Sequence, residues 1–473
     1  MKATLINPGI NQKYAVQEPL NLGFLASHLL ANGIEVIIID ELAGQDVARL
    51  LQDYKPDIAG ITATTPLAAD AYRVAGMCRE MGIRTVMGGV HASVMPDEAL
   101  RHVDVVVSGE GETALVDIIK DDIRSGIITR PYIRDIDSIP PPARHLIQMD
   151  FYVRSKSRIP HSYLYFVPEG AKIASVLTSR GCPYSCIYCH NTWRGTPTRY
   201  NSPERVISEI IALKKDYAVE TIFFIEDNLF VNKKRLRAIC ELIIDNNIEV
   251  LWGGNARVDN IDPEILALAK RAGCRQITFG FESGSQRMLE ILKKKTTVAQ
   301  NKQAIEMCND AGIIPQGTFI VGSPMETLED VRLTMKFIED SNIESAGICI
   351  ATPYPGTKLW DWAQENNLMP QTYSWSDFDY LNTPINLSPA IPKQELLGLI
   401  DKINVLLVMR QKGRVNVLSA LKGIAKEPSK LFTIVQSLLN NPHLIRNLAE
   451  RFVSQIFSGL ISRKISSRWR RQS

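Results

Sequence analysis

Residues 179–190 read SRGCPYSCIYCH, and this stretch holds three of the eight cysteines in the 473-residue chain. Cys182, Cys186 and Cys189 follow a C-x3-C-x2-C spacing, with Gly181 and Pro183 on either side of the first cysteine. Glycine and proline bend the backbone, so three thiolates can converge on one metal centre. A structural zinc site needs a fourth ligand, whereas three cysteines on a four-iron cubane leave one iron atom open. The spacing therefore predicts a [4Fe-4S] cluster loop.

Two other interpretations of these cysteines are weaker. His190 follows Cys189 and could complete a zinc site, but neighbouring side chains rarely reach the same ion. Disulfide bonds are disfavoured because the chain opens on a strand-like segment without a secretory signal. The other cysteines are isolated in apolar or helical contexts, and we expect them to be small core residues: Cys78, Cys240, Cys274, Cys308 and Cys349.

The cysteine motif resembles the signature of the radical S-adenosylmethionine (SAM) enzymes, with Tyr188 in its aromatic position. The resemblance implies that the open iron chelates the amino and carboxylate groups of SAM. It also implies that an electron from the cluster cleaves SAM to a 5′-deoxyadenosyl radical inside a partial (β/α)6 barrel.

Length and composition set broad limits. The chain is long enough for more than one domain, and its 45% hydrophobic and 22% charged residues are typical of a globular protein. No run approaches the eighteen or more uncharged apolar residues of a membrane-spanning helix. Because an oxygen-sensitive cluster with free thiols suits a reducing compartment, we expect a cytoplasmic location.

Residues 1–127 alternate short strands with helical patterns, which predicts an α/β domain with a parallel sheet wrapped by helices. The expected strands are residues 2–7, 35–40, 58–62, 84–87 and 103–107, with helices that include residues 22–31 and 68–81. Ligands of such sheets bind beyond the C-terminal ends of the strands. Glycines and polar residues gather at that edge: Pro8, Thr64, Thr65, Gly88, Gly89, His91, Gly109, Glu110 and Gly111.

On residues 88–91, 95–100 and 109–112, this domain resembles the cobalamin-binding domain that precedes the barrel in one large radical SAM subgroup. The resemblance implies a flavodoxin-like (Rossmann-type) fold and a corrin site at the residues just named. No D-x-H-x-x-G follows the first strand, so no histidine is identified as the lower axial ligand of cobalt. Many members of the subgroup lack that histidine and bind cobalamin with its own base displaced. The alternative is a flavodoxin-like domain that binds no cofactor and covers the barrel.

Individual residues of this edge carry their own expectations. His91 is expected to bond the backbone rather than cobalt. Glu110 and Glu112 are expected either to contact a corrin amide or to be exposed at a helix N-terminus, where the helix dipole favours negative charge. A tryptophan in place of Gly89 is expected to fill the corrin space and expel cobalamin.

Residues 128–171 form a connector rich in proline and charge, with the stretch IPPPAR at 139–144. Consecutive prolines favour an extended segment, so we expect a strap that positions the two domains. From 172 to 370, six strand and helix pairs predict the partial barrel. Its expected strands are residues 173–178, 221–226, 250–256, 276–282, 317–321 and 346–351. Active sites of such barrels lie at the C-terminal ends of the strands.

The resemblance assigns the SAM site to residues at these strand ends. Glu226 stands where many members carry Gly-Gly-Glu for the SAM amino group, and Glu282 is expected to accept from the ribose hydroxyls. Residues 317–326, GTFIVGSPME, are similar to the family's G-x-I-x-G-x-x-E adenine region. The expected SAM-binding residues are Tyr188, Glu226, Glu282, Ser283, Ile320 and Gly322.

The resemblance covers residues 1–365 approximately and implies a cobalamin-dependent radical SAM enzyme that functionalises an unactivated carbon, most often by methyl transfer. An oxidative cyclase or hydroxylase of tetrapyrrole or lipid biosynthesis is the alternative enzyme, and a regulatory cobalamin and iron-sulfur sensor is the non-enzyme alternative. A methylthiotransferase would need three cysteines in the N-terminal domain, where only Cys78 is available. The expected partners are a tetrapyrrole, lipid or natural-product substrate and a reductase, flavodoxin or ferredoxin as electron donor.

Residues 371–473 are expected to be mostly helical and to end in a basic tail. No acidic residue occurs after 450, and apolar residues recur every three to four positions along one helical stripe. Two interpretations are open: a helix docked on the barrel, or an interfacial helix on the anionic inner face of a membrane. We expect no nucleic-acid binding, since the tail contains no recognised module.

Overall fold

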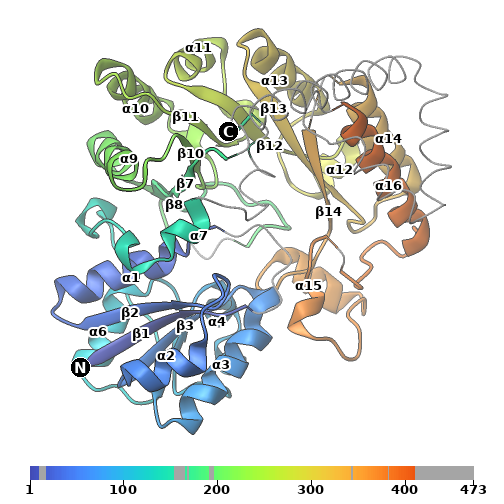
Figure 1. Cartoon of the computed structure of the whole chain (residues 1–473). Coiled ribbons are helices and arrows are strands. Elements are labelled where there is room, and N and C mark those ends of the chain that lie inside the picture. The colour runs from blue at the N-terminus through green and yellow to red at the C-terminus, as the bar shows by residue number, and fades with distance from the viewer. Residues whose placement is uncertain are drawn as a thin grey trace, which may run out of the picture.

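The computed structural model describes residues 1–9, 17–153, 164, 166–167, 170–190, 196–341, 343, 345–381 and 383–410 (Figure 1). The basic tail predicted at the C-terminus lies outside these residues. In Figure 1 the N-terminal domain is drawn in blue, the barrel runs from green to orange, and α15 lies beside the N-terminal domain. None of the described helices is long and apolar enough to cross a membrane.

The N-terminal domain contains a six-stranded sheet with the order β2-β1-β3-β4-β5-β6, and all its neighbouring strands are parallel. Its strands are β1 (Lys2–Asn7), β2 (Glu35–Asp40), β3 (Ile58–Thr62), β4 (Arg84–Gly88), β5 (Val105–Val107) and β6 (Gly126–Ile128). Its helices are α1 (Leu20–Ala31), α2 (Val47–Tyr54), α3 (Ala68–Glu80), α4 (Val90–Val94), α5 (Pro96–Ala99) and α6 (Glu112–Lys120). The five predicted strands are present, whereas β6 was not predicted.

Alternation along these strands explains the layers. Leu5 and Val86 pack on the face covered by α1 and α6, whereas Ile6 and Met87 pack on the opposite face with α2 and α3. Successive side chains of a strand point to opposite faces, so each strand supplies both hydrophobic layers. β6 has only three residues, and its central Ile127 is exposed, which leaves little hydrophobic pattern to recognise.

The described part of the connector contains short turns and one helix rather than a fully extended strap: η2 (Ile136–Ser138), η3 (Arg144–Leu146) and α7 (Met149–Val153). The hydroxyl of Tyr152 donates to Asp40 Oδ2 at 2.5 Å, which ties α7 to the end of β2. Arg144 Nη2 donates to the carbonyl of Ser175 at 2.8 Å and to Glu209 Oε1 at 2.5 Å. The connector therefore contacts both domains, as expected.

The barrel sheet is also parallel and has the order β14-β13-β12-β11-β10-β7. Its strands are β7 (Ile173–Val176), β10 (Thr221–Phe224), β11 (Leu251–Ala256), β12 (Cys274–Glu282), β13 (Ile314–Val321) and β14 (Ser345–Ile350). The helices are α9 (Pro203–Tyr217), α10 (Lys233–Asp245), α11 (Pro263–Arg271), α12 (Gln286–Ile291), α13 (Val298–Asp310), α14 (Leu328–Asp340), α15 (Lys358–Glu365) and α16 (Lys393–Arg410). A short antiparallel pair, β8 (Ser179–Arg180) and β9 (Arg199–Tyr200), was not predicted.

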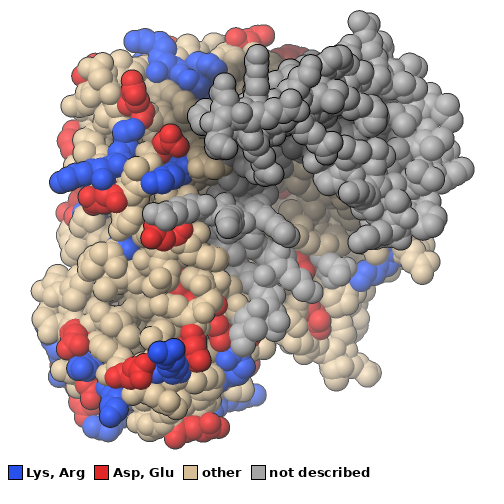
Figure 2. Space-filling view, viewed as in Figure 1, with Lys and Arg blue, Asp and Glu red and all other residues tan. Residues whose placement is uncertain are grey.

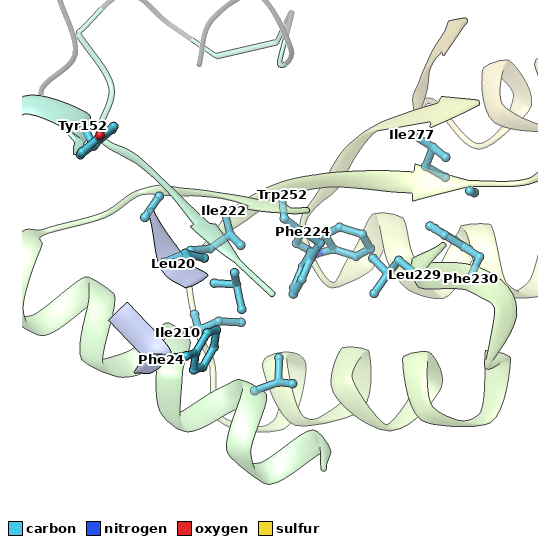
Figure 3. Close-up of a cluster of buried hydrophobic side chains, with 14 of the residues drawn as sticks. Leu20, Phe24, Tyr152, Ile210, Ile222, Phe224, Leu229, Phe230, Trp252 and Ile277 are labelled. Carbon is cyan, nitrogen blue, oxygen red and sulfur yellow. The ribbon is translucent and has the colours of Figure 1, made fainter. Parts of the chain in front are cut away.

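One continuous buried cluster joins the two domains (Figure 3). Leu20 and Phe24 of α1 belong to the same cluster as Ile210 of α9 and Ile222 of β10. Deeper in the barrel, the rings of Phe224 and Trp252 meet edge to face with centroids 5.5 Å apart. The shared core fixes the N-terminal sheet against the barrel.

The drawn surface carries mixed charges (Figure 2), and the cysteines outside the loop are buried or half-buried. On the face drawn in Figure 2, acidic and basic side chains are mixed over the N-terminal domain and the outer barrel helices. Helix α9 begins after Ser202, because the Ser202 side chain accepts from the amide of Arg205 and Pro203 takes the first helical position. The isolated cysteines are in the core as predicted, fully buried at Cys78, Cys240, Cys274 and Cys308 and half-buried at Cys349.

Candidate cofactor site

The three-cysteine loop lies at the C-terminal end of the barrel sheet, between β8 and β9. Gly181 turns the chain after β8 with a φ of 99°, a conformation that favours glycine. The amide of Ile187 donates to the carbonyl of Leu292 at 3.2 Å, and its carbonyl accepts from the amide of Leu359 at 3.1 Å. The loop is therefore held between the end of α12 and the start of α15.

The thiols in this loop fit an iron-sulfur cluster. Cys186 is buried, Cys182 is half-buried and Cys189 is exposed. Although the Cys189 side chain reaches the surface, the surrounding protein atoms restrict solvation of its thiolate, and this desolvation, followed by the negative charges of Asp227 and the other two thiolates, raises the pKa of Cys189 to about 12. Mutual repulsion of this kind is relieved when iron displaces the thiol protons.

A single metal ion fits less well. Among the described residues, no group of three or more His, Cys, Asp or Glu side chains is arranged to hold one ion. In a four-iron cubane each cysteine binds a different iron atom, so the three sulfur atoms need not surround one common point. Three cysteines with one thiolate for each of three iron atoms thus suit a cluster.

A buried triad adjoins the loop. The hydroxyl of Tyr188 donates to Glu282 Oε1 at 2.7 Å, and Lys294 Nζ donates to the same oxygen at 2.7 Å. Burial, followed by the charge of Glu282, raises the pKa of Tyr188 well above its usual value, so the phenol stays a donor. Glu282 adopts a φ of 61° where the register of β12 and β13 shifts, which turns its carboxylate toward the loop.

Lys294 was not predicted as a site residue. It is the middle of the run Lys293, Lys294 and Lys295, which looks like a solvated charge cluster in the sequence. The fold leaves Lys294 only 6% exposed and pairs it with Glu282. No local signal distinguishes it from its two neighbours.

Glu226 has a different environment from the one expected for a SAM ligand. Its carboxylate is buried and accepts hydrogen bonds from the hydroxyls of Thr178 and Ser179. Arg235 Nη1 lies 3.9 Å from the same carboxylate. The side chain of the neighbouring Asp227 is exposed, and its charge adds to the larger effect of desolvation in raising the pKa of both Cys182 and Cys189. Asp227, rather than Glu226, is thus the acid beside the cysteines.

The other expected SAM residues divide into two groups. Ile320 and Tyr188 pack against one small cluster of buried side chains near α15, and Gly322 follows with a φ of 74°. Ser283 instead faces α14, where its hydroxyl lies 3.0 Å from Thr334 Oγ1. The structure therefore brings Tyr188, Glu282 and Ile320 to the cysteine loop and turns the Ser283 hydroxyl toward the protein interior.

A cavity of about 230 Å³ lies between the N-terminal sheet and helices α1 and α6, and it reaches Leu177 and Arg180 of the barrel. It is lined by five of the residues expected for cobalamin: Gly88, Gly89, Gly109, Glu110 and Gly111. Its inner wall is apolar, with Leu5, Val86, Val107 and Leu115. A Cβ atom at Gly60 would come within 2.8 Å of Leu5 Cδ2, so the absence of a side chain keeps this space open.

Pro8, Thr64, Thr65 and His91 are not among the residues that line this cavity. His91 is fully buried, with Nε2 3.0 Å from the Tyr72 hydroxyl and Nδ1 3.3 Å from Thr65 Oγ1. His91 is thus engaged by side chains rather than by the backbone contact expected of it. The lining residues in the described part of the chain include no histidine.

Glu110 and Glu112 are buried, which excludes the alternative that they are exposed charges at a helix N-terminus, whereas contact with a corrin amide stays a prediction. Arg180 donates to Glu110 Oε1 at 2.7 Å and to Glu112 Oε1 at 2.6 Å. Arg199 Nη1 donates to Glu110 Oε2 at 3.0 Å. Although burial opposes it, these hydrogen bonds from Arg199 and Arg180 lower the pKa of Glu110. The N-terminal segment alone does not predict this burial, because both arginines come from the barrel and reach the glutamates only in the folded chain.

Both domains of the chain match known protein families. Residues 176–338 match the radical SAM superfamily, and residues 12–119 match the B12 binding domain. The chain is 33% identical over 422 residues to an uncharacterized methyltransferase of Pyrococcus horikoshii, covering 83% of this chain and 88% of the relative. It is 29% identical over 416 residues to the anaerobic magnesium-protoporphyrin IX monomethyl ester cyclase of Rubrivivax gelatinosus, covering 81% and 72%.

The fold also matches a solved structure. The radical SAM methyltransferase TsrM from Kitasatospora setae, with cobalamin and a [4Fe-4S] cluster bound, superimposes with a TM-score of 0.64 at 17% identity. The match covers 88% of this chain and 96% of that chain.

The chain belongs to the cobalamin-binding radical SAM family, and it is an enzyme. The predicted fold class is confirmed by the two parallel sheets and the two matched domains. The radical SAM domain accounts for the predicted [4Fe-4S] cluster and SAM, and the B12 binding domain accounts for cobalamin.

Proposed function

We propose that the protein methylates an unactivated carbon of a small-molecule substrate at the junction of its two domains. When bound, the cluster and SAM supply a 5′-deoxyadenosyl radical, and cobalamin supplies the methyl group. The observation that carries this proposal is the position of Arg180. It lines the cavity of the N-terminal domain and stands two residues before Cys182. The corrin and the cluster would thus share one interface.

Within this proposal, Cys182, Cys186 and Cys189 would hold the cluster. Tyr188 and Lys294 orient the Glu282 carboxylate beside the loop, where it can accept from hydroxyls of SAM. The apolar cavity would take the displaced base of cobalamin, because the missing side chains at Gly60 and neighbouring glycines leave a slot against the sheet.

We propose a tetrapyrrole as the substrate class, with a lipid as the next candidate. The support is the similarity to the magnesium-protoporphyrin IX monomethyl ester cyclase, whose name identifies a tetrapyrrole substrate. A reductase, flavodoxin or ferredoxin would supply the electron. Contact of the basic tail with an anionic membrane also stays a proposal.

Oxidative cyclisation is the second candidate reaction, and the same relative favours it. The two reactions differ in product mass. Methyl transfer adds one CH2 group to the substrate, whereas oxidation adds oxygen or removes hydrogen. Mass spectrometry of products formed from a panel of porphyrin esters separates them.

The first prediction tests the cluster ligands and the reaction class together. Replacing Cys182, Cys186 or Cys189 by alanine should abolish the absorption of the reconstituted cluster and the reductive cleavage of SAM, because each cysteine holds a different iron. Cys240→Ala is the matched control, since Cys240 is fully buried in the barrel core. Formation of 5′-deoxyadenosine under anaerobic reduction is the measurement. Full iron content and SAM cleavage in Cys186→Ala would contradict the assignment.

A further inference from the structure

The guanidinium of Arg180, a barrel residue, contacts three side chains of the N-terminal domain. Its two terminal nitrogens bond different carboxylates, Glu110 at 2.7 Å and Glu112 at 2.6 Å. The guanidinium carbon lies 5.6 Å from the ring centroid of Phe24 on α1. A guanidinium presents its donors in a rigid planar fork, so two carboxylates fix its orientation as well as its charge.

These four residues also line the cavity. Phe24, Glu110, Glu112 and Arg180 contribute to one wall of the space between α1, α6 and the sheet. Any cofactor that fills this cavity therefore touches the ion pairs or the ring beside them. The ion pairs are buried, so their geometry cannot be replaced by water at low cost.

The same glutamate anchors both strands that carry the cluster loop. Arg180 on β8 pairs with Arg199 on β9 in the antiparallel register, and both donate to Glu110. The three cysteines lie in the connection between these two strands. Glu110, which follows β5 of the N-terminal sheet, thus accepts hydrogen bonds from the two strands on either side of the cluster loop.

We propose that Arg180 is a positioning residue that couples occupancy of the cobalamin cavity to the conformation of the cluster loop. This inference rests on the proposed function of the two sites. Cobalamin in the cavity stabilises one arrangement of Glu110, Glu112 and Arg180, and that arrangement sets the start of the loop two residues before Cys182. Linkage makes the effect reciprocal, so a loaded cluster changes the affinity for cobalamin by the same factor.

The test measures this linkage in the full chain. The dissociation constant of hydroxocobalamin is determined anaerobically by absorption, with and without the reconstituted cluster. In the natural chain we expect the two constants to differ by about fivefold or more. In Arg180→Lys the ratio should fall to about one, because an ammonium cannot hold two carboxylates in the planar fork.

Arg144→Lys is the matched control. Arg144 is a similarly enclosed arginine, with its side chain 8% exposed against 13% for Arg180, and it bonds Ser175 and Glu209 and lies 3.9 Å from Glu18 Oε1. It does not line the cavity. A purely structural loss of a buried guanidinium would affect both variants, whereas the coupling role predicts that Arg144→Lys keeps the natural ratio.

Two outcomes overturn the inference: a ratio of about one in the natural chain, or a natural ratio in Arg180→Lys. If Arg180→Lys does not fold, Glu112→Gln gives a second test, since it removes the negative charge of one partner of Arg180 and should lower the ratio as well. Absence of any hydroxocobalamin binding by the natural chain in either cluster state would instead refute the proposed function itself. In that case the absorption spectrum of hydroxocobalamin would not change when the protein is added.

Discussion

Two carboxylates of the barrel, Glu326 and Asp330, lie four residues apart and have opposite pKa shifts. Burial raises the pKa of Glu326 from 4.5 to about 7, despite hydrogen bonds from the amides of Ser323 and Gly322. Asp330 is also buried, but bonds from Arg287, Ser285 and Thr327 outweigh that burial and lower its pKa well below the usual range. The ionisation of these two carboxylates therefore depends more on the hydrogen-bond donors around them than on how deeply they are buried.

The Glu326 shift predicts a pH dependence of stability. Because its pKa is higher in the folded chain than in the unfolded chain, folding takes up a proton between pH 4.5 and 7. The free energy of unfolding should therefore fall as pH rises through this window, by at most about 3 kcal/mol. Glu326→Gln should flatten this slope, because its amide oxygen can still accept from Ser323 and cannot ionise.

Thermal melts at pH values above and below this window measure the effect. Asp330→Asn is an informative comparison, because it removes only the smaller contribution of the Asp330 charge to the Glu326 shift and should change the slope between pH 4.5 and 7 much less than Glu326→Gln does. An identical slope in Glu326→Gln and the natural chain would show that another group causes the dependence.

At the scale of secondary-structure elements, the end of β4 shows how neighbouring glycines serve different purposes. A Cβ atom at Gly88 would have Val107 Cβ at 3.9 Å as its nearest neighbour, so a side chain there enters the cavity. Gly89 has a φ of 95°, and its Cβ would lie 2.8 Å from the carbonyl oxygen of Ala63. The expectation that a tryptophan at Gly89 fills the corrin space is therefore wrong, because it would strike the backbone after β3.

This difference predicts two distinct phenotypes. Gly88→Leu should abolish retention of hydroxocobalamin with little loss of stability, since it fills the cavity without backbone strain. Gly89→Ala should lower the free energy of unfolding by about 1–3 kcal/mol, because a side chain is forced into the left-handed region and against a carbonyl. Cobalamin absorption after gel filtration and thermal melts measure the two effects. Normal cobalamin retention in Gly88→Leu would argue against this cavity as the corrin site.

At the scale of the whole molecule, the segment after the barrel returns to the N-terminal domain. Trp375 of η6 (Trp375–Asp377) donates from Nε1 to Glu98 Oε1 at 3.1 Å. Its ring meets the ring of His91 edge to face at 4.7 Å. Although burial opposes it, hydrogen bonds from His91, Tyr72 and Trp375 lower the pKa of Glu98. The contact joins residues almost three hundred positions apart.

The contact predicts how firmly this segment is held. Trp375→Phe keeps an aromatic ring but loses a hydrogen bond to a charged group, which is worth about 1.5–3 kcal/mol. Amides of residues 374–378 should then exchange with solvent roughly tenfold faster or more. Trp360→Phe is the control, because the Trp360 ring packs against Phe378 and should lose less. Equal protection in Trp375→Phe and the natural chain would mean that ring packing alone holds the segment.

The sequence by itself determined the features that depend on short-range spacing. Three cysteines within eight residues predict a cluster loop because their distance along the chain limits their distance in space. Alternating hydrophobic residues predict the strands of both sheets because side chains alternate between the two faces. From these patterns the family, the fold class and the cofactors followed without any tertiary contact.

Only the tertiary structure decided which charged residues are buried and which partners they meet. Lys294 differs from its neighbours in the same lysine run only because the fold brings it to Glu282, and Arg180 finds Glu110 some seventy residues away. The Glu226 carboxylate is enclosed by the hydroxyls of Thr178 and Ser179, which come from another strand end. The energy of a buried charge depends on donors supplied by distant segments, and no local pattern records which segments those are.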